Sequence, residues 1–229
     1  MIGPAGATGP SGPAGPKGDP GGNIASLDAL AGLACTTGGK SGTSELTYDG
    51  QNHAVLTCVV SVASPQVRIN EFATGVTSAA ANEFVELVNS GGSPLDVSGY
   101  KLVYRSATGT SDVSLGTIPA GTIIAAGGFY LFGGSAYAGS PAADQSFSTG
   151  LAATGGGLGL RDPDGNLVDS VGYGSGTTNA FVETAPAPAP PTTASPGSSD
   201  VRIPNGADTN DNSADFTVSS TPTPRGSNS

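Results

Sequence analysis

The chain of 229 residues has few of the features that would place it in a membrane or on a nucleic acid. It contains no run of about eighteen apolar residues, so no transmembrane helix is expected. Lys and Arg number only 8 against 18 Asp and Glu, a formal net charge of −10. Phosphate backbones and anionic membrane surfaces attract clustered cations, so neither nucleic acid nor membrane is expected as a partner. The acidic balance favours solubility or divalent cations.

Residues that carry common catalytic and metal chemistry are also scarce. The chain has one histidine, His53, and two cysteines, Cys35 and Cys58. A structural zinc site takes four Cys or His ligands, which these residues cannot supply. A Ser/His/Asp arrangement needs a histidine beside its serine, and His53 lies in a segment apart from the main domain. We therefore expect no enzymatic activity.

Glycine, by contrast, is abundant and in one stretch periodic. It occupies every third position from Gly3 to Gly21, and residues 3–20 form uninterrupted triplets that include five prolines. Only Gly fits the axis of a triple helix, so residues 1–22 are predicted to be a collagen-like stretch. A homotrimer through this stretch is a hypothesis, because so few triplets need more repeat upstream or a trimeric neighbouring domain. No signal peptide precedes the repeat, so we expect a natural N-terminus upstream or another export route.

Residues 23–63 predict a small module of a helix and a hairpin. Apolar residues at regular spacing over 24–33, with Ser26 as a candidate N-cap, predict a short helix. The Asp49–Gly50 dipeptide between two β-prone runs predicts a hairpin turn. A module of about 40 residues is too small to be stable without a covalent or metal staple.

The two cysteines are the candidates for that staple. A disulfide between Cys35 and Cys58 would close a loop worth about 3.4 kcal/mol by the chain-entropy estimate. Disulfides are typical of exported proteins, so this pairing predicts an extracellular location. The alternative is two buried free thiols in a cytosolic protein, which would remove the argument for export.

From residue 66 onward, short runs rich in β-branched and aromatic residues are each bounded by Gly, Ser, Asn or Pro. Such runs, about ten residues apart, are typical of an antiparallel β-sandwich. The sequence 162–166, Asp-Pro-Asp-Gly-Asn, predicts a type I turn closed by Gly165. The expected strands are 66–72, 82–89, 99–105, 111–116, 128–133, 158–161, 167–173, 200–203 and 215–219.

Several of these segments occur in an order that resembles one known family. They are 67–72, 83–89, 95–102, 202–216 and 223–228. With them, residues 64–229 resemble the lamin tail domain. The resemblance implies an all-β, immunoglobulin-like β-sandwich and leaves the ligand open. The chain departs from the family pattern at Tyr100, where Trp is often found, and in a Pro-rich insertion over residues 185–199.

Two glutamates fall on predicted strands beside apolar residues. Glu71 shares a strand face with Val67 and Ile69, and Glu86 shares one with Phe84 and Val88. A carboxylate on an apolar face must find a cation or hydrogen-bond donors, and the candidate cations are Arg68, Lys101 and Arg105. We interpret Glu71 and Glu86 as structural carboxylates. The alternative is a carboxylate pair for acid–base catalysis or metal binding.

A cluster of oxygen-bearing side chains lies near the C-terminus. Asp208, Asn210 and Asn212 follow the first three positions of a calcium loop, and Asp211 and Asp215 add carboxylates. The pattern then fails, because Ser213 stands where the EF-hand needs Gly. Asp and Asn are also common in turns, where they bond their own backbone. Two hypotheses therefore stay open: a calcium site at Asp208, Asn210, Asp211 and Asp215, or a structural turn before the last strand.

The leading functional hypothesis is a non-enzymatic extracellular structural or binding module, displayed on the collagen-like stretch for adhesion, assembly or surface display. Its ligand would be an extracellular protein or a carbohydrate, and no cofactor is required, although calcium is a candidate. The first rival is a calcium-dependent binding module. The second is an accessory domain of a secreted hydrolase such as a nuclease. The expected domains are 1–22, 23–63 and 64–229.

Overall fold

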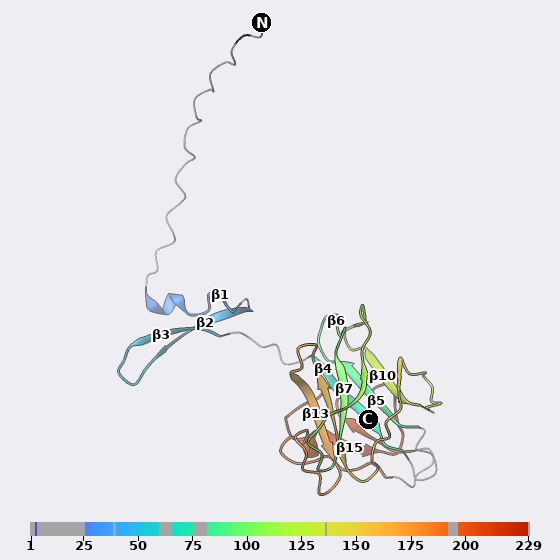
Figure 1. The fold of residues 1–229 in the computed structure, drawn as a ribbon. Helices are drawn as coiled ribbons and strands as arrows, with labels where there is room; N and C mark the ends of the chain where they lie inside the picture. The colour runs from blue at the N-terminus through green and yellow to red at the C-terminus, as the bar shows by residue number, and fades with distance from the viewer. Residues whose placement is uncertain are drawn as a thin grey trace. The chain divides into compact units, whose positions relative to one another are not determined.

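The computed structural model describes residue 3 and residues 26–38, 40–59, 66–75, 82–135, 137–191 and 197–228. The chain divides into two compact units, Met1–Val62 and Ala63–Ser229, which we call the N-terminal unit and the sandwich unit (Figure 1). The predicted collagen-like stretch lies outside the described residues apart from Gly3. Within the described residues, no helix has the length and apolar character needed to cross a bilayer.

The described part of the N-terminal unit is an antiparallel three-stranded sheet in the order β1-β2-β3, preceded by a 3₁₀ helix (Figure 1). The predicted Asp49–Gly50 hairpin is present between β2 and β3. The predicted disulfide is confirmed, since Cys35 and Cys58 are bonded to each other. The elements are η1 (Leu27–Leu30), β1 (Ala34–Thr37), β2 (Lys40–Tyr48) and β3 (Ala54–Val59).

The predicted short helix after Ser26 is present as a 3₁₀ helix. The element is a single 3₁₀ turn of four residues, and Ser26 occupies the N-cap position without a side-chain capping bond. A serine from the neighbouring strand holds the turn instead: the Leu33 N–H donates to Ser44 Oγ at 3.0 Å, and Ser44 Oγ donates to the Leu30 carbonyl. This hydroxyl bonds the C-terminal end of the turn, where helical backbone groups lack partners.

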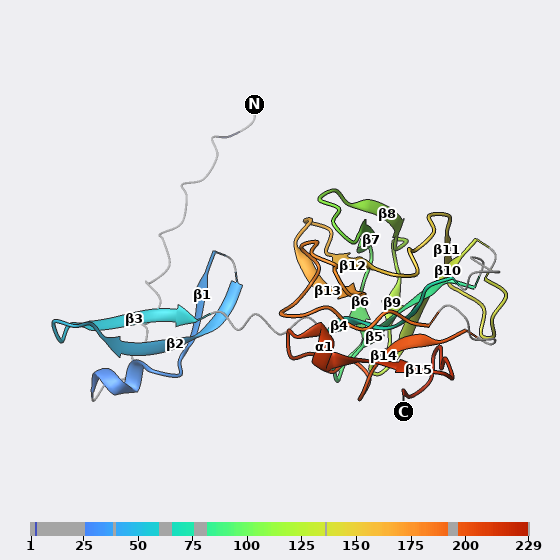
Figure 2. The same ribbon diagram turned by 90° about the horizontal axis from the view of Figure 1, so that it is seen from below.

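The sandwich unit consists of two main sheets packed face to face, which Figure 2 shows from the side. One has six strands in the order β11-β10-β5-β4-β14-β15, and the other has four in the order β13-β12-β7-β8. A two-stranded sheet, β6-β9, accompanies them. The strands of the six-stranded sheet are β4 (Val67–Ala73), β5 (Phe84–Asn89), β10 (Phe129–Gly134), β11 (Gln145–Phe147), β14 (Ser199–Arg202) and β15 (Phe216–Ser219). The others are β6 (Leu95–Asp96), β7 (Lys101–Ser106), β8 (Val113–Thr117), β9 (Ile123–Ile124), β12 (Gly156–Arg161) and β13 (Leu167–Tyr173), with one helical turn, α1 (Asn212–Asp215).

The main core lies between the two large sheets. Successive side chains of a strand point to opposite faces, so alternate residues of β5 enter this core. In β4 an irregularity between Ile69 and Glu71 brings both Ile69 and Phe72 into the core, so the prediction that Glu71 shares a face with Val67 and Ile69 was wrong. The core residues of these two strands include Ile69, Phe72, Val85 and Leu87. Facing residues of the four-stranded sheet include Leu102, Leu158, Leu160, Val171 and Tyr173. Phe72 packs against Tyr173 with ring centroids 5.0 Å apart, which joins the two layers. The structure is therefore all-β, consistent with an immunoglobulin-like sandwich.

The predicted turn at residues 162–166 is present and joins β12 to β13. The Asp162 N–H donates to the Asn166 carbonyl at 3.0 Å, and the Gly165 N–H donates to the Asp162 carbonyl at 3.0 Å. Gly165 has a φ of +90°, a conformation that glycine adopts without a Cβ penalty. The turn chemistry in the sequence thus sets this hairpin locally.

Candidate functional site

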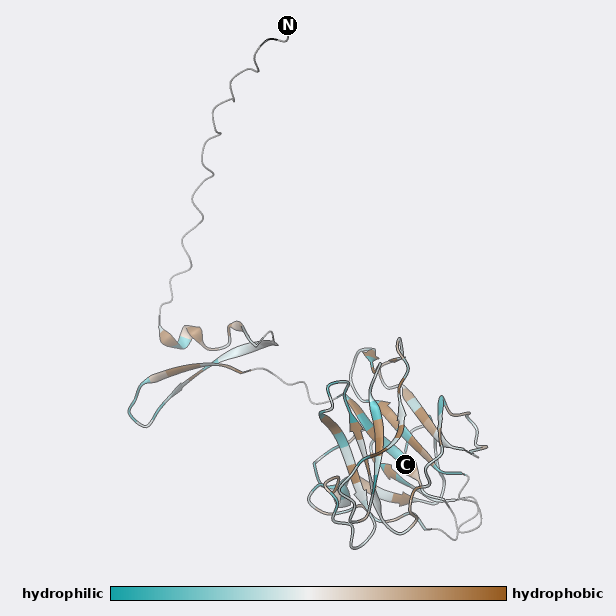
Figure 3. Cartoon of the chain, viewed as in Figure 1, coloured by the Kyte–Doolittle hydropathy of each residue, from teal (hydrophilic) through white to brown (hydrophobic). Residues whose placement is uncertain are grey.

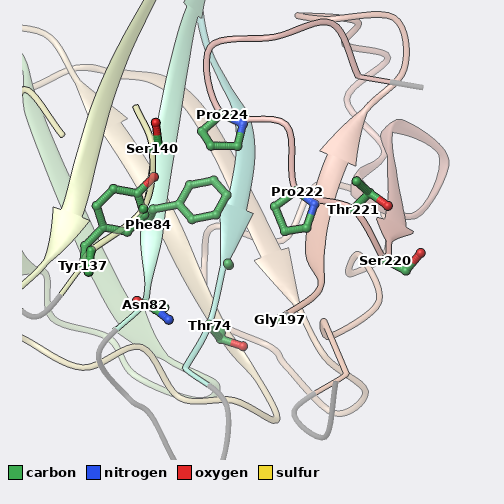
Figure 4. Close-up of a pocket in the computed structure, with 13 residues that line it drawn as sticks. Thr74, Asn82, Phe84, Tyr137, Ser140, Gly197, Ser220, Thr221, Pro222 and Pro224 are labelled. Carbon is green, nitrogen blue, oxygen red and sulfur yellow. The ribbon is translucent and has the colours of Figure 1, made fainter. Parts of the chain in front are cut away.

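A pocket of about 390 Å³ opens on the face of the six-stranded sheet that is turned away from the main core. There Ala73, Phe84 and Leu131 form a second, smaller apolar cluster, because they alternate with core residues along their strands. The pocket lies over this cluster (Figure 4). None of the described residues that line it carries a charge. The main lining residues are Thr74, Asn82, Phe84, Tyr137, Pro222 and Pro224.

One wall of the pocket is aromatic. Phe84 and Tyr137 meet edge to face with ring centroids 6.0 Å apart, and Figure 4 shows Phe84 between Tyr137 and the two prolines. Tyr137 fits closely because glycines flank it: a Cβ on Gly133 would lie 2.9 Å from the Tyr137 Cβ, and one on Gly139 would lie 2.4 Å from its hydroxyl oxygen. The Tyr137 hydroxyl donates to the Pro141 carbonyl at 3.3 Å, which fixes the ring.

A hydroxyl group remains unused at the pocket. Thr74 follows β4 and is 5% exposed, and its Oγ1 has no hydrogen-bond partner among the described residues. A buried hydroxyl without a partner is costly. The Thr74 oxygen has almost no exposed surface, so this residue contributes to the lining of the pocket without presenting its hydroxyl to solvent.

The opposite wall is formed by the C-terminal segment, and the two predicted structural carboxylates hold that segment in place. Glu71 and Glu86 are fully buried and lie opposite each other on β4 and β5. The Thr223 N–H donates to Glu71 Oε1 at 2.9 Å, and the Arg225 N–H donates to Glu86 Oε2. Pro224 lies between these two anchored residues, so the carboxylates position the proline wall.

The two carboxylates also receive side-chain hydrogen bonds. Ser199 Oγ donates to Glu71 at 2.6 Å, and Asn70 Nδ2 donates to Glu86 at 2.9 Å. Burial raises the pKa of Glu71, and burial together with the neighbouring Glu71 charge raises the pKa of Glu86 to about 7. Two adjacent buried acids resist double ionisation.

The cations considered from the sequence as partners for the glutamates serve elsewhere. Arg68 Nε lies 2.9 Å from Asp208, Arg105 Nε lies 2.6 Å from Asp112, and Lys101 is exposed. Glu71 and Glu86 do receive hydrogen-bond donors, as expected, but these donors are not the cations of nearby strands. The donors found come mainly from positions more than 120 residues away, which strand periodicity cannot reveal.

A second polar cluster surrounds the fully buried Arg202 on β14. Its Nη1 lies 3.0 Å from Asp215 Oδ2 and 3.6 Å from Asp208 Oδ1, and its Nη2 lies 3.2 Å from Asp169 Oδ1. The guanidinium carbon also stands 4.4 Å from the centroid of the Phe216 ring, a cation–π arrangement. This network joins β14, β13 and the segment before β15.

The residues proposed from the sequence as calcium ligands are only partly brought together. Asp208 and Asp215 come within 4.8 Å of Glu183, a residue that the sequence pattern did not single out. Asp211 instead caps α1, accepting the Ser213 N–H, and Asn210 has a φ of 59° in the preceding turn. The loop therefore does not wrap around one point as a calcium loop does. The alternative, a structural turn before the last strand, matches the four-residue helical turn α1, where Asp208 and Asp211 accept from nearby backbone N–H groups.

The charges at this cluster decide its chemistry. Burial opposes ionisation of Asp215, but hydrogen bonds from Thr209 and the charge of Arg202 lower its pKa overall. Asp208 is likewise shared between Arg68 and Arg202. A divalent cation among these carboxylates would stand against a guanidinium group and be repelled by it.

A family model of the lamin tail domain matches residues 61–175, just over half of the chain. The chain belongs to the lamin tail domain family. A search of curated proteins found no match. The lamin tail domain is an immunoglobulin-like, non-enzymatic fold, which agrees with the sandwich described above.

Only some of the residues that line the pocket lie within the part of the chain that matches the family model. Thr74, Phe84 and Tyr137 lie within the stretch that matches the lamin tail domain, whereas Pro222 and Pro224 come after it. The proline wall, Arg202 and the anchoring residues of the C-terminal segment are thus supplied by the part of the chain beyond residue 175. In the sequence, residues 223–228 stand out only as part of the resemblance, because the backbone N–H groups by which Thr223 and Arg225 are anchored have no counterpart in residue type.

Calcium is expected to leave the melting temperature of this lamin tail domain protein unchanged, because guanidinium groups already neutralise Asp208 and Asp215. Melting would be followed by circular dichroism in 5 mM CaCl₂ and in EDTA. A site with a dissociation constant of about 0.1 mM would stabilise the fold by about 2 kcal/mol at that concentration. An increase in melting temperature of about 5 °C would accordingly contradict this expectation.

Proposed function

We propose that the chain is a non-enzymatic, extracellular binding module carried on a collagen-like stalk, and that its sandwich unit takes up an uncharged peptide segment in the pocket. The observation that carries the proposal is the pocket itself. The described residues that line it are aromatic, proline and small residues, and none of them carries a charge. Ligand sites are typically apolar hollows with a few polar groups that orient the ligand.

The chemistry of the walls favours a peptide over a sugar. Tyr137 and the two prolines form an apolar groove of the kind that takes up extended, proline-rich segments. A sugar ring needs several convergent hydrogen-bonding groups, whereas Phe84, Tyr137 and the two prolines offer mainly apolar surface, which suits a peptide.

The extracellular location and the stalk rest on sequence features. The disulfide between Cys35 and Cys58 is typical of oxidising compartments. The glycine period of residues 3–20 is the signature of collagen-like chains. Binding, adhesion or assembly through a displayed domain fits both, and it requires no catalytic group.

Isothermal titration of the full chain with a synthetic peptide of alternating Ala and Pro tests the proposal. We expect saturable binding that falls at least about tenfold, or 1.4 kcal/mol, in Tyr137→Ala. The matched control is Tyr100→Ala, which removes another partly buried tyrosine of the same unit that does not line the pocket.

The control should bind the peptide like the unaltered chain. Equal losses in both variants would place binding elsewhere. Binding of a neutral hexasaccharide in place of the peptide would make the ligand a carbohydrate. Absence of binding to either probe would refute the pocket as a ligand site.

A further inference from the structure

The described residues of the N-terminal unit form no apolar core of their own. Among all described residues, ten large apolar side chains are exposed and six of them lie in this unit, although the sandwich unit contains most of the described residues. Ser44 is the one residue in the described part of the N-terminal unit that is buried. A small sheet is stable when an apolar face is packed against another layer. The exposed six are Leu27, Leu33, Tyr48, Val55, Leu56 and Val59.

Strand register shows that the two faces of this sheet differ. Leu46 pairs with Leu56 and Tyr48 pairs with Ala54, so these four residues share one face. We call it the leucine face. The opposite face carries the pairs Glu45–Thr57, Thr47–Val55 and Thr43–Val59, which are more polar. Figure 3 shows the apolar residues along β3 in brown.

The sequence before this sheet points to what covers the leucine face. The glycine repeat ends at residue 21, and η1 begins at Leu27. A collagen triple helix brings three identical chains side by side, so three copies of this sheet would emerge next to one another. Linking them in this way gives each copy a high effective concentration of its partners. The η1 turn meets this face at Ser44, whose side chain points the same way as Leu46 and Tyr48. Beyond Ser44 the face stays exposed at Leu56 and Tyr48, and the same face of a neighbouring chain would cover it.

We propose that the leucine face associates with the same unit in two further copies of this chain, so that the N-terminal unit holds a homotrimer directly after the collagen-like stretch. Three identical surfaces around a threefold axis form a closed ring of equivalent contacts. The charged Glu45 lies on the other face, so the contact does not bury its carboxylate. The net charge of −10 opposes an anionic membrane as the alternative cover.

The test is the mass of the full chain in solution, measured by light scattering after size exclusion at 4 °C. We expect a species three times the 22.1 kDa of one chain. Leu56→Lys should convert it to a single chain. The matched control is Val55→Lys on the adjacent residue, which is similarly exposed (41% against 51%) but points to the other face, and it should stay trimeric.

A second variant tests the same face in case Leu56→Lys fails to fold. Tyr48→Lys changes the leucine face at the end of β2, where the side chain is 55% exposed, and should also yield a single chain. Absence of free thiols in all variants would show that Cys35 and Cys58 still pair and that the unit is folded. Equal masses for Leu56→Lys and Val55→Lys would overturn the proposal. So would a single chain or a dimer in the unaltered protein, or binding of that single chain to anionic vesicles. None of these outcomes bears on peptide binding to the sandwich unit.

Discussion

Asp200→Asn is expected to stabilise the sandwich unit at pH 9 by about 4 to 6 kcal/mol and to have little effect near pH 4. Asp200 lies on β14 opposite Phe72 of β4 and Val218 of β15 and is fully buried. Neither carboxylate oxygen has a hydrogen-bond partner among the described residues. An ionised carboxylate in such surroundings is strongly disfavoured.

The pH range follows from the direction of the shift. Burial raises the pKa of Asp200 from 3.8 to about 8 in the folded chain. The folded state therefore binds the proton more tightly than the unfolded state, and stability falls as the pH rises from about 4 to about 8. Asn cannot ionise, so the stability of the variant does not fall with pH for this reason. Burial also raises the pKa of Tyr173 nearby, so the Tyr173 hydroxyl stays neutral in this range.

Urea denaturation at pH 5, 7 and 9 measures the effect, followed by near-ultraviolet circular dichroism, because five of the six tyrosines lie in the sandwich unit. Other buried acids such as Glu86 are present in both chains, so the difference between the variant and the unaltered chain gives the contribution of Asp200 to the pH dependence of the free energy of unfolding. Asp164→Asn, in the exposed turn between β12 and β13, is the control and should leave the pH profile unchanged. A difference between Asp200→Asn and the unaltered chain that does not vary with pH would contradict the assignment.

Arg202→Met is expected to destabilise the sandwich unit by about 3 to 5 kcal/mol, because it leaves buried carboxylates without their cation. Asp169 and Asp215 are both buried and both contact the Arg202 guanidinium. The Arg202 side chain also donates to the carbonyls of Ile69 and Ala207, at 2.9 and 2.7 Å. The substitution therefore also removes a hydrogen bond between β14 and β4. Methionine keeps the length and apolar volume of the stem while removing the charge and the donors.

The matched control for this substitution is Arg225→Met. The Arg225 side chain pairs with Asp144 at the exposed surface, and its backbone bond to Glu86 survives the change. Exposed ion pairs are worth less than about 1 kcal/mol. Thermal melting should therefore separate the two variants by about 10 °C for a domain of this size. Equal melting temperatures would mean that the buried network does not carry the stability assigned to it.

Local features of the sequence predicted most of the strands and the turns between them. Period-two alternation predicted β5 and β13, and the turn at residues 162–166 closed its hairpin as expected, whereas in β4 the alternation is broken between Ile69 and Glu71. These features act over a few residues, so the local chain is enough to specify them. The same holds for the disulfide, since two cysteines allow one intramolecular pairing.

The site, by contrast, is assembled from distant parts of the chain. Thr74, Tyr137 and Pro224 meet around one pocket, and Thr223 reaches Glu71 across 152 positions. The cations chosen from the sequence for the glutamates were wrong for this reason, and Glu183 was missed beside Asp208 and Asp215. Which polar groups meet depends on sheet order and on how the C-terminal segment folds back, and no local pattern encodes either.

The amino-acid order alone thus determined the all-β class, the resemblance to the lamin tail domain, the disulfide and the glycine repeat. The first two and the repeat follow from the spacing of residue types along the chain, and the disulfide follows because two cysteines allow one intramolecular pairing. Only the tertiary structure decided that Arg202 neutralises the acidic cluster, that the buried glutamates anchor the proline wall and that the leucine face is exposed at Leu56 and Tyr48. The physical reason is that burial and pairing of charges are properties of packed neighbours rather than of sequence neighbours.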